Sequence, residues 1–170
     1  ASLTTAGRRA ALLTIRRHRV IEAYLTKALG YSWDRVHDEA ERLEHAASPE
    51  LIGRMAKVLG NPTADPHGAP IPTPEGRVDE RRFASIAGLE PGAGAIVVRM
   101  SDRDPKLLRY LAGRGIRPGA RIRVETREPF DGPIVLTVGR ARQTIAPGAA
   151  EKVWVNPDGT RRPAKRRPSA

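Results

Sequence analysis

The sequence predicts an α+β protein in which a helical domain precedes a small SH3-like β-barrel. Up to Gly60, apolar residues recur at helical spacing. From Phe83 onward they fall in short runs separated by Gly and Pro, which is typical of strands. Five prolines between these halves exclude long regular structure there. We therefore expect a helical domain over residues 1–74, a linker over 75–82, an SH3-like domain over 83–156 and a disordered basic tail over 157–170.

The N-terminal half predicts three helices. The first covers residues 4–29, with a threonine cap at its start and Gly30 just past its end. Its apolar residues cover more than one face, which indicates a partner helix from a second subunit and hence a homodimer. Ser32 should cap a second helix that ends near Ala47, and Ser48-Pro49 should begin a third that ends at Gly60.

The connecting segment and the C-terminal half follow other patterns. Residues 61–74 should form an extended strap that packs on the helices through Ile71. Asp104-Pro105 opens a short helix that ends at Gly113. The candidate strands are Ala95–Met100, Arg121–Thr126, Ile134–Val138, Gln143–Ile145 and Lys152–Val155. Short strands with one helical turn are typical of a small barrel.

Composition limits the classes of function. Of 170 residues, 39% are hydrophobic and 29% charged, so the chain should fold. It has no cysteine, which excludes disulfides, zinc–thiolate sites and cysteine nucleophiles, and fits a reducing cytoplasm. We find no apolar run near the roughly 20 residues of a membrane span, and no signal-peptide pattern in these residues. We expect a cytoplasmic protein without a membrane partner.

The net charge of +11 suggests attraction to nucleic acid. The segment from Pro157 holds five basic residues against one acid, and the other basic residues are spread without interleaved aromatics. This pattern favours salt-dependent attraction to phosphates over reading of bases.

Acids and imidazoles cluster on the second helix. Helical spacing places His37, Glu41, Glu44 and His45 on one narrow arc that borders an apolar stripe. On the first helix His18 and Glu22 share a face. Imidazole nitrogen and carboxylate oxygen suit divalent first-row metals. Two such groups on neighbouring helices predict a metal site rather than solvated surface charge.

Other classes of function have weaker signals. A ferritin-like enzyme would need Glu-x-x-His on two helices, but Arg42 stands three residues before His45. The segment from His37 to Glu41 lacks the His-Glu-x-x-His pattern of zinc peptidases. A metal-dependent helical-bundle enzyme and an SH3-like interaction module without metal sensing remain alternatives. We interpret His67, in the proline-rich strap, as a packing or hydrogen-bonding residue.

Several segments together resemble the diphtheria-toxin-repressor family of metal-dependent transcription regulators. They are residues 3–8, 17–22, 36–40, 43–45 and 66–72, and the resemblance runs from Ala1 to about Pro72. The second half resembles the FeoA-like SH3 domain of many members through residues 107–111 and 115–119. The resemblance implies a helical metal-binding dimerisation domain followed by a small SH3-like β-barrel, in a homodimer without enzymatic activity or a small-molecule substrate.

The resemblance also implies ligands. In manganese-type members, residues matching His18, Glu41, Glu44 and His45 combine with acids of an N-terminal winged-helix domain. In iron-type members, a second site uses positions matching His18, Glu22 and His37, completed by the SH3-like domain. Asp104 falls near one of those SH3-domain positions, whereas Leu107 occupies the other and cannot coordinate a metal.

The residue at position 41 discriminates between metals. Iron-type members have a cysteine there, and the carboxylate of Glu41 favours Mn²⁺, with Fe²⁺ or Zn²⁺ as alternatives. Because the chain begins with Ala1 rather than Met, we expect a fragment of a longer protein. The resemblance implies that a winged-helix domain is absent from this chain and that operator DNA would be bound through that domain.

Overall fold

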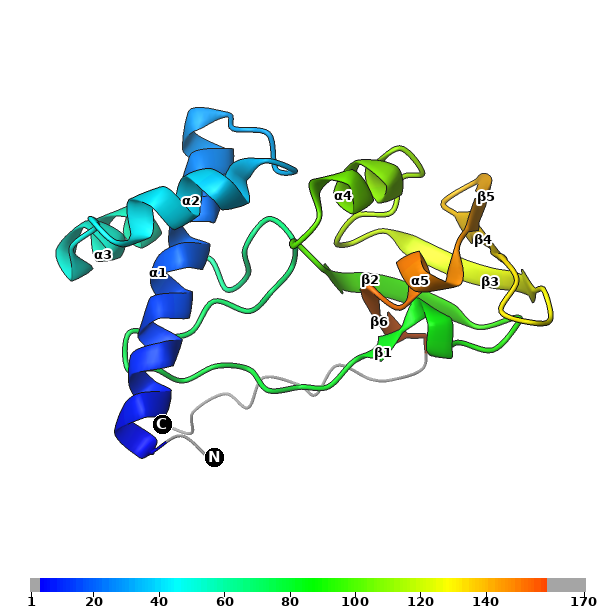
Figure 1. Ribbon diagram of the computed structural model, residues 1–170, viewed down its shortest axis with the longest axis horizontal. Helices are drawn as coiled ribbons and strands as arrows, with labels where there is room; N and C mark the ends of the chain where they lie inside the picture. Colours follow the sequence, from blue (N-terminus) through cyan, green and yellow to red (C-terminus); the bar gives the residue numbers. More distant parts are fainter. Residues whose placement is uncertain (1–3, 159–170) are drawn as a thin grey trace, which may run out of the picture.

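The computed structural model describes residues 4–158 as a helical unit and a β-sheet unit that lie side by side (Figure 1). The helical unit holds α1 (Thr5–Leu29), α2 (Val36–Glu44) and α3 (Pro49–Val58). Helices α2 and α3 pack against the C-terminal half of α1, around a core of Val20, Ile21, Leu25, Val36, Ala40, Ile52, Ala56 and Ile71. The predicted α+β class is confirmed.

Helix boundaries follow the capping residues at α1 and α3. The Thr4 side chain accepts a hydrogen bond from the Gly7 amide, and Gly30 ends α1 with a φ of 72°. Ser48 caps α3 in the same way, with Pro49 in the first turn. These predicted boundaries are confirmed.

The predicted start of α2 at Ser32 is wrong. The Ser32 hydroxyl donates to the Asp34 carboxylate, and the Arg35 amide donates to the Ser32 carbonyl, so the chain makes a turn there. The helix begins only at Val36 and ends at Glu44. The turn carries Trp33 out of the helix to pack against the core of the sheet unit.

The strap crosses between the two units. Ile71 is buried in the helical core, as predicted, and Ala64 pairs with Pro70 in an isolated bridge. The linker then runs along the N-terminal half of α1 (Figure 1). Gly76 lies against Arg9, and Glu80 forms an ion pair with Arg8.

The sheet unit is a six-stranded antiparallel sheet in the order β1-β6-β2-β3-β4-β5. Its strands are β1 (Ala84–Ser85), β2 (Gly94–Met100), β3 (Arg121–Arg127), β4 (Ile134–Val138), β5 (Ala141–Ile145) and β6 (Val153–Pro157). It also includes the short helices η1 (Ile86–Gly88), α4 (Pro105–Ala112) and α5 (Pro147–Ala150). All five predicted strands and the predicted helix after Asp104 are present. Strand β1, η1 and α5 are too short to give a periodic signal.

The start of the predicted tail needs a correction. Pro157 belongs to β6 because it pairs with Ala95, and the Asp158 carboxylate binds Arg121. The rest of that segment, 159–170, lies outside the described residues.

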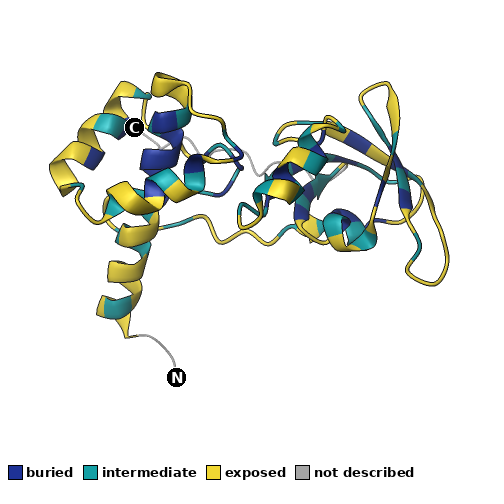
Figure 2. Cartoon of the chain, turned by 45° about the horizontal axis from the view of Figure 1, so that its top comes forward, coloured by how far each residue is buried: buried dark blue, intermediate teal, exposed yellow. Residues whose placement is uncertain are grey.

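Buried residues concentrate in two cores, one in each unit (Figure 2). Four polar residues are buried with them: Glu22, Asp34, Asp65 and His67. Within residues 4–158, the structure contains no helix of the length and apolarity that a membrane span requires.

Candidate metal centre

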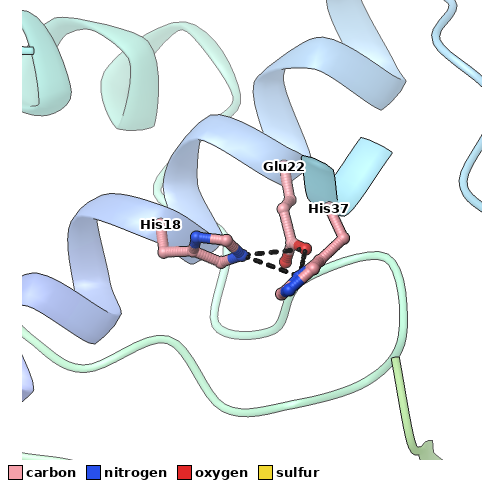
Figure 3. A group of neighbouring side chains, drawn as sticks. All are labelled: His18, Glu22 and His37. Carbon is pink, nitrogen blue, oxygen red and sulfur yellow. Dashed lines mark hydrogen bonds and ion pairs between the residues drawn. The ribbon is translucent and has the colours of Figure 1, made fainter. Parts of the chain in front are cut away.

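Three predicted ligands converge between α1 and α2. His18 and Glu22 lie one turn apart on α1, and His37 follows the buried Val36 at the start of α2. Glu22 Oε1 lies 3.2 Å from His18 Nε2 and 3.1 Å from His37 Nδ1, and these two nitrogens are 3.0 Å apart (Figure 3). We call these residues the histidine cluster. Three donor atoms at this spacing can hold one divalent ion.

Two further predicted ligands lie beside the histidine cluster. His18 Nδ1 lies 2.9 Å from Glu44 Oε2, so carboxylates contact both nitrogens of this ring. Glu41 and Glu44 line a cavity of about 310 Å³ together with His18 and His37. The cavity is therefore lined by oxygen and nitrogen donors from both helices.

The remaining two predicted ligands, His45 and Asp104, do not belong to the histidine cluster. His45 has an exposed side chain, with Nε2 3.6 Å from Glu44 Oε1. Asp104 caps α4 by accepting a hydrogen bond from the Lys106 amide at 2.8 Å. The carboxylate that the sheet unit brings toward the helical unit is that of Asp102.

Contacts inside the histidine cluster favour the charged forms of His18 and Glu22. Burial alone would raise the pKa of Glu22, but the hydrogen bond with His18 and the nearby charges of His18 and His67 bring it below its ordinary value. Burial would lower the pKa of His18, but its bonds to Glu22 and Glu44 outweigh burial and raise it. The three donor atoms of the histidine cluster thus have hydrogen-bond partners in one another without a metal.

A second group, which we call the strap cluster, contains Glu22, Asp65, His67 and Asp102. One potential ligand atom from each of the four lies within 4.8 Å of the others. Asp65 and His67 come from the strap and Asp102 from the segment after β2, so both units contribute. Within residues 4–158, the histidine and strap clusters are the two groups of at least three ligand residues at this spacing.

The strap cluster leaves buried acceptors without hydrogen bonds. Within the described residues, Glu22 Oε2, Asp65 Oδ2 and His67 Nδ1 are all buried and lack a hydrogen-bond partner. Asp65 Oδ1 accepts from the amides of His67 and Ala69, whereas Arg19 Nε approaches Oδ2 only to 3.5 Å. Buried polar atoms normally have partners, so these three atoms point to a cation-binding site.

Backbone contacts also fix the ring of His67. Its Nε2 donates to the Trp33 carbonyl oxygen at 2.7 Å, which in the neutral ring leaves a lone pair on Nδ1. Burial, and then the charge of Glu22, raise the pKa of Asp65 to about 6. Two carboxylates buried together repel each other, and a divalent ion between them would remove that repulsion.

The sequence did not single out Asp65 or Asp102, and we interpreted His67 as a packing or hydrogen-bonding residue. Its bond to the Trp33 carbonyl agrees with that interpretation, but its position among three carboxylates makes it a candidate ligand as well. The signal that could have found it was the pair Asp65-Pro66-His67, an acid and an imidazole two residues apart in the strap.

Comparison with known proteins supports the resemblance seen in the sequence. Residues 4–73 match the family model described as iron dependent repressor, metal binding and dimerisation domain, and residues 85–157 match the FeoA domain. The iron-dependent repressor IdeR of Mycobacterium tuberculosis is 35% identical over 165 residues, covering 90% of this chain and 71% of that relative. The chain belongs to the iron-dependent repressor family. The predicted family membership is thereby confirmed.

Other members of the iron-dependent repressor family are also similar. The diphtheria toxin repressor of Corynebacterium diphtheriae is 43% identical over 94 residues, which are 55% of this chain and 40% of that relative. A solved manganese-dependent transcriptional repressor in complex with manganese superposes with a TM-score of 0.87 at 44% identity, covering 91% of this chain and 73% of that one. The manganese regulator SloR gives a TM-score of 0.79 at 28% identity, with 91% and 72% covered.

Proposed function

We propose that this chain is the metal-sensing and dimerisation part of a Mn²⁺-dependent DNA-binding transcriptional regulator of metal homeostasis. The observation that carries the proposal is the shared carboxylate of Glu22. One of its oxygens faces the two imidazoles of the histidine cluster, and the other is buried without a hydrogen-bond partner. Each oxygen can then serve one cluster, so that each cluster takes one ion.

The donor atoms support manganese. Both clusters offer only nitrogen and oxygen, Glu41 adds a carboxylate in the adjoining cavity, and the chain has no cysteine. Hard oxygen-rich sites suit Mn²⁺, although Zn²⁺ binds most nitrogen–oxygen sites more tightly in vitro. A relative at 44% identity was solved in complex with manganese, which agrees with this choice.

Exposed apolar side chains support a homodimer. Leu43 on α2 and Leu51 and Val58 on α3 are exposed, and Val58 keeps 71% of its surface accessible. Pairing with a second copy would remove such side chains from water. The matched family domain is described as a dimerisation domain, and two-fold pairing suits palindromic operators.

A bound metal ion would hold together helices and segments that are separate in the sequence. Ligands of α1 and α2 meet in the histidine cluster, and ligands of α1, the strap and the sheet unit meet in the strap cluster. Metal-bound chains would hold these elements in one arrangement and so shift the population toward a DNA-binding form. We assign the DNA contact to a winged-helix domain outside these residues, and we propose no catalytic role, since the relatives are named repressors.

Metal content after equilibrium dialysis against Mn²⁺, Fe²⁺ or Zn²⁺ tests this proposal. We expect two Mn²⁺ per chain, and a dimer in sedimentation at micromolar concentration. Glu41→Cys should raise affinity for Fe²⁺ and Zn²⁺ relative to Mn²⁺, because thiolate is a softer ligand. Glu50→Gln, an exposed substitution on α3, is the control and should change nothing. A chain that retains no divalent metal, or only a monomer, would contradict the proposal.

A further inference from the structure

The strap lies directly against β2 at one point. Gly68 has a φ of 86°, and a Cβ atom at this position would lie 2.0 Å from the carbonyl oxygen of Val98. Val98 lies at a register shift of β2 between Val97 and Arg99. One residue before the glycine, the His67 carbonyl accepts a hydrogen bond from the Met100 amide at 3.0 Å. The close approach of the two backbones therefore requires a residue without a side chain.

The turn before α2 makes a second contact with the sheet unit. Trp33 packs against the sheet core, with the guanidinium of Arg117 5.0 Å from its ring centroid. The neighbouring Asp34 forms an ion pair with Arg109 of α4 at 2.9 Å. This turn is thus anchored on the sheet unit by an aromatic ring and by an ion pair.

Both contacts converge on His67. Its carbonyl is bound by Met100 of the sheet unit, and its Nε2 is bound by the carbonyl of Trp33, whose ring lies 5.5 Å from the imidazole. Asp102 follows Met100 by two residues and is the sheet unit's member of the strap cluster. Docking of the two units therefore orients the imidazole and also brings in the fourth ligand.

We propose that the Trp33 turn and the Gly68 contact form a docking device that assembles the strap cluster, so that metal binding there and docking of the SH3-like domain are coupled. Gly68 and Trp33 are positioning residues in this account, because they act through His67 and Asp102. The inference rests on the proposed metal-binding function. Without docking, the cluster keeps only Glu22, Asp65 and an unanchored His67, a poorer site for a divalent ion. Coupling of this kind is reciprocal, so metal must also favour docking.

Two alanine substitutions, each at a glycine with a positive φ, separate the effect of docking from that of backbone strain. Gly60→Ala is the matched control, since Gly60 has a φ of 72° but a Cβ atom at this position would have no neighbour within 4 Å. Both variants suffer similar strain, whereas only Gly68→Ala meets the backbone of β2. The readouts are the radius of gyration from solution X-ray scattering and the number and affinity of bound Mn²⁺.

We expect Gly68→Ala to enlarge the radius of gyration of the metal-free chain and to weaken binding of one of the two Mn²⁺ by at least about tenfold. Gly60→Ala should match the unsubstituted chain in both respects. The proposal is overturned if Gly68→Ala stays compact with both ions bound, or if its domains separate while both ions bind with unchanged affinity. A chain that binds no Mn²⁺ in any variant would instead refute the proposed function, and with it the coupling, whatever the scattering shows.

Asp102→Asn keeps the test decisive if Gly68→Ala fails to fold. This substitution removes the sheet unit's ligand without adding an atom near β2. The metal-free variant should stay as compact as the unsubstituted chain and lose the same Mn²⁺, while Mn²⁺ should no longer reduce its radius of gyration. Unchanged binding of both ions to Asp102→Asn would overturn the proposal.

Discussion

The histidine cluster and the strap cluster share Glu22 but differ in how well they satisfy their own polar atoms. His18 and His37 contact Glu22 Oε1 directly, and Glu44 completes the contacts of His18. The strap cluster instead buries three acceptors without hydrogen bonds and raises the pKa of Asp65 to about 6. The donor atoms of the first group have hydrogen-bond partners without metal and lie beside a cavity, whereas the second group buries acceptors that a cation could pair. Unpaired buried acceptors therefore distinguish two candidate metal sites built around one carboxylate.

Glu22→Gln should have the largest effect, because both clusters lose their common ligand. We expect the affinity of both Mn²⁺ to fall on the order of 100-fold, corresponding to about 2.7 kcal/mol for each ion. Isothermal titration calorimetry measures this, with Glu50→Gln as the control. Loss of one ion alone would show that Glu22 belongs to a single site.

Single substitutions within one cluster should remove one ion. His67→Ala should abolish binding at the strap cluster and spare the histidine cluster, whereas His37→Ala should do the reverse, because neither residue is shared. Metal content after dialysis checks this prediction, first for each single variant and then for the double variant. If either single substitution removed both ions, the two clusters would be one site.

Asp65→Asn should stabilise the metal-free chain and remove the stabilisation that Mn²⁺ provides at the strap cluster. Because the pKa of Asp65 in the folded chain, about 6, exceeds its ordinary value of 3.8, its ionised form opposes folding. The gain in the free energy of unfolding should be on the order of 1–3 kcal/mol above about pH 6. It should vanish below about pH 4, where the folded and the unfolded chain both bind the proton. Urea unfolding at several pH values measures it, and a constant difference across this range would contradict the assignment.

The smallest effect should come from Asp34→Asn. The hydrogen bond from Ser32, and then the contact with Arg109, lower the pKa of Asp34. The Asp34 carboxylate therefore stabilises the folded chain above its ordinary pKa near 4. This stabilisation is lost as the pH falls through the lower pKa that Asp34 has in the folded chain. Because Arg109 is half exposed, we expect a loss of only about 0.5 kcal/mol at pH 7. The same unfolding series should show the opposite pH dependence from that of Asp65.

Local patterns allowed the helical part of the site to be predicted. His18 and Glu22 share a face because they are one turn apart, and the caps at Thr4 and Ser48 set the helix starts. The position of Trp33 could not be read in this way, since Ser32 bonds to the Asp34 side chain instead of capping a helix.

The strap cluster was missed for a different reason. Asp65 and His67 lie in irregular chain, and Asp102 comes from another unit, so no periodic pattern relates them to Glu22. The packing of the strap on β2, at Gly68, brings Asp102 of the sheet unit to the other three residues. The sequence shows which residues could bind a metal, but it does not show that packing of the two units brings them together.

In the proposed function, one buried carboxylate, Glu22, serves two metal sites. Anomalous diffraction at the manganese edge from crystals of this chain grown with Mn²⁺ tests it most directly. We expect two anomalous peaks, one beside His18 and His37 and one beside Asp65 and His67, with a Glu22 oxygen coordinated to each. A single peak, or two peaks of which one has no Glu22 ligand, would contradict the account.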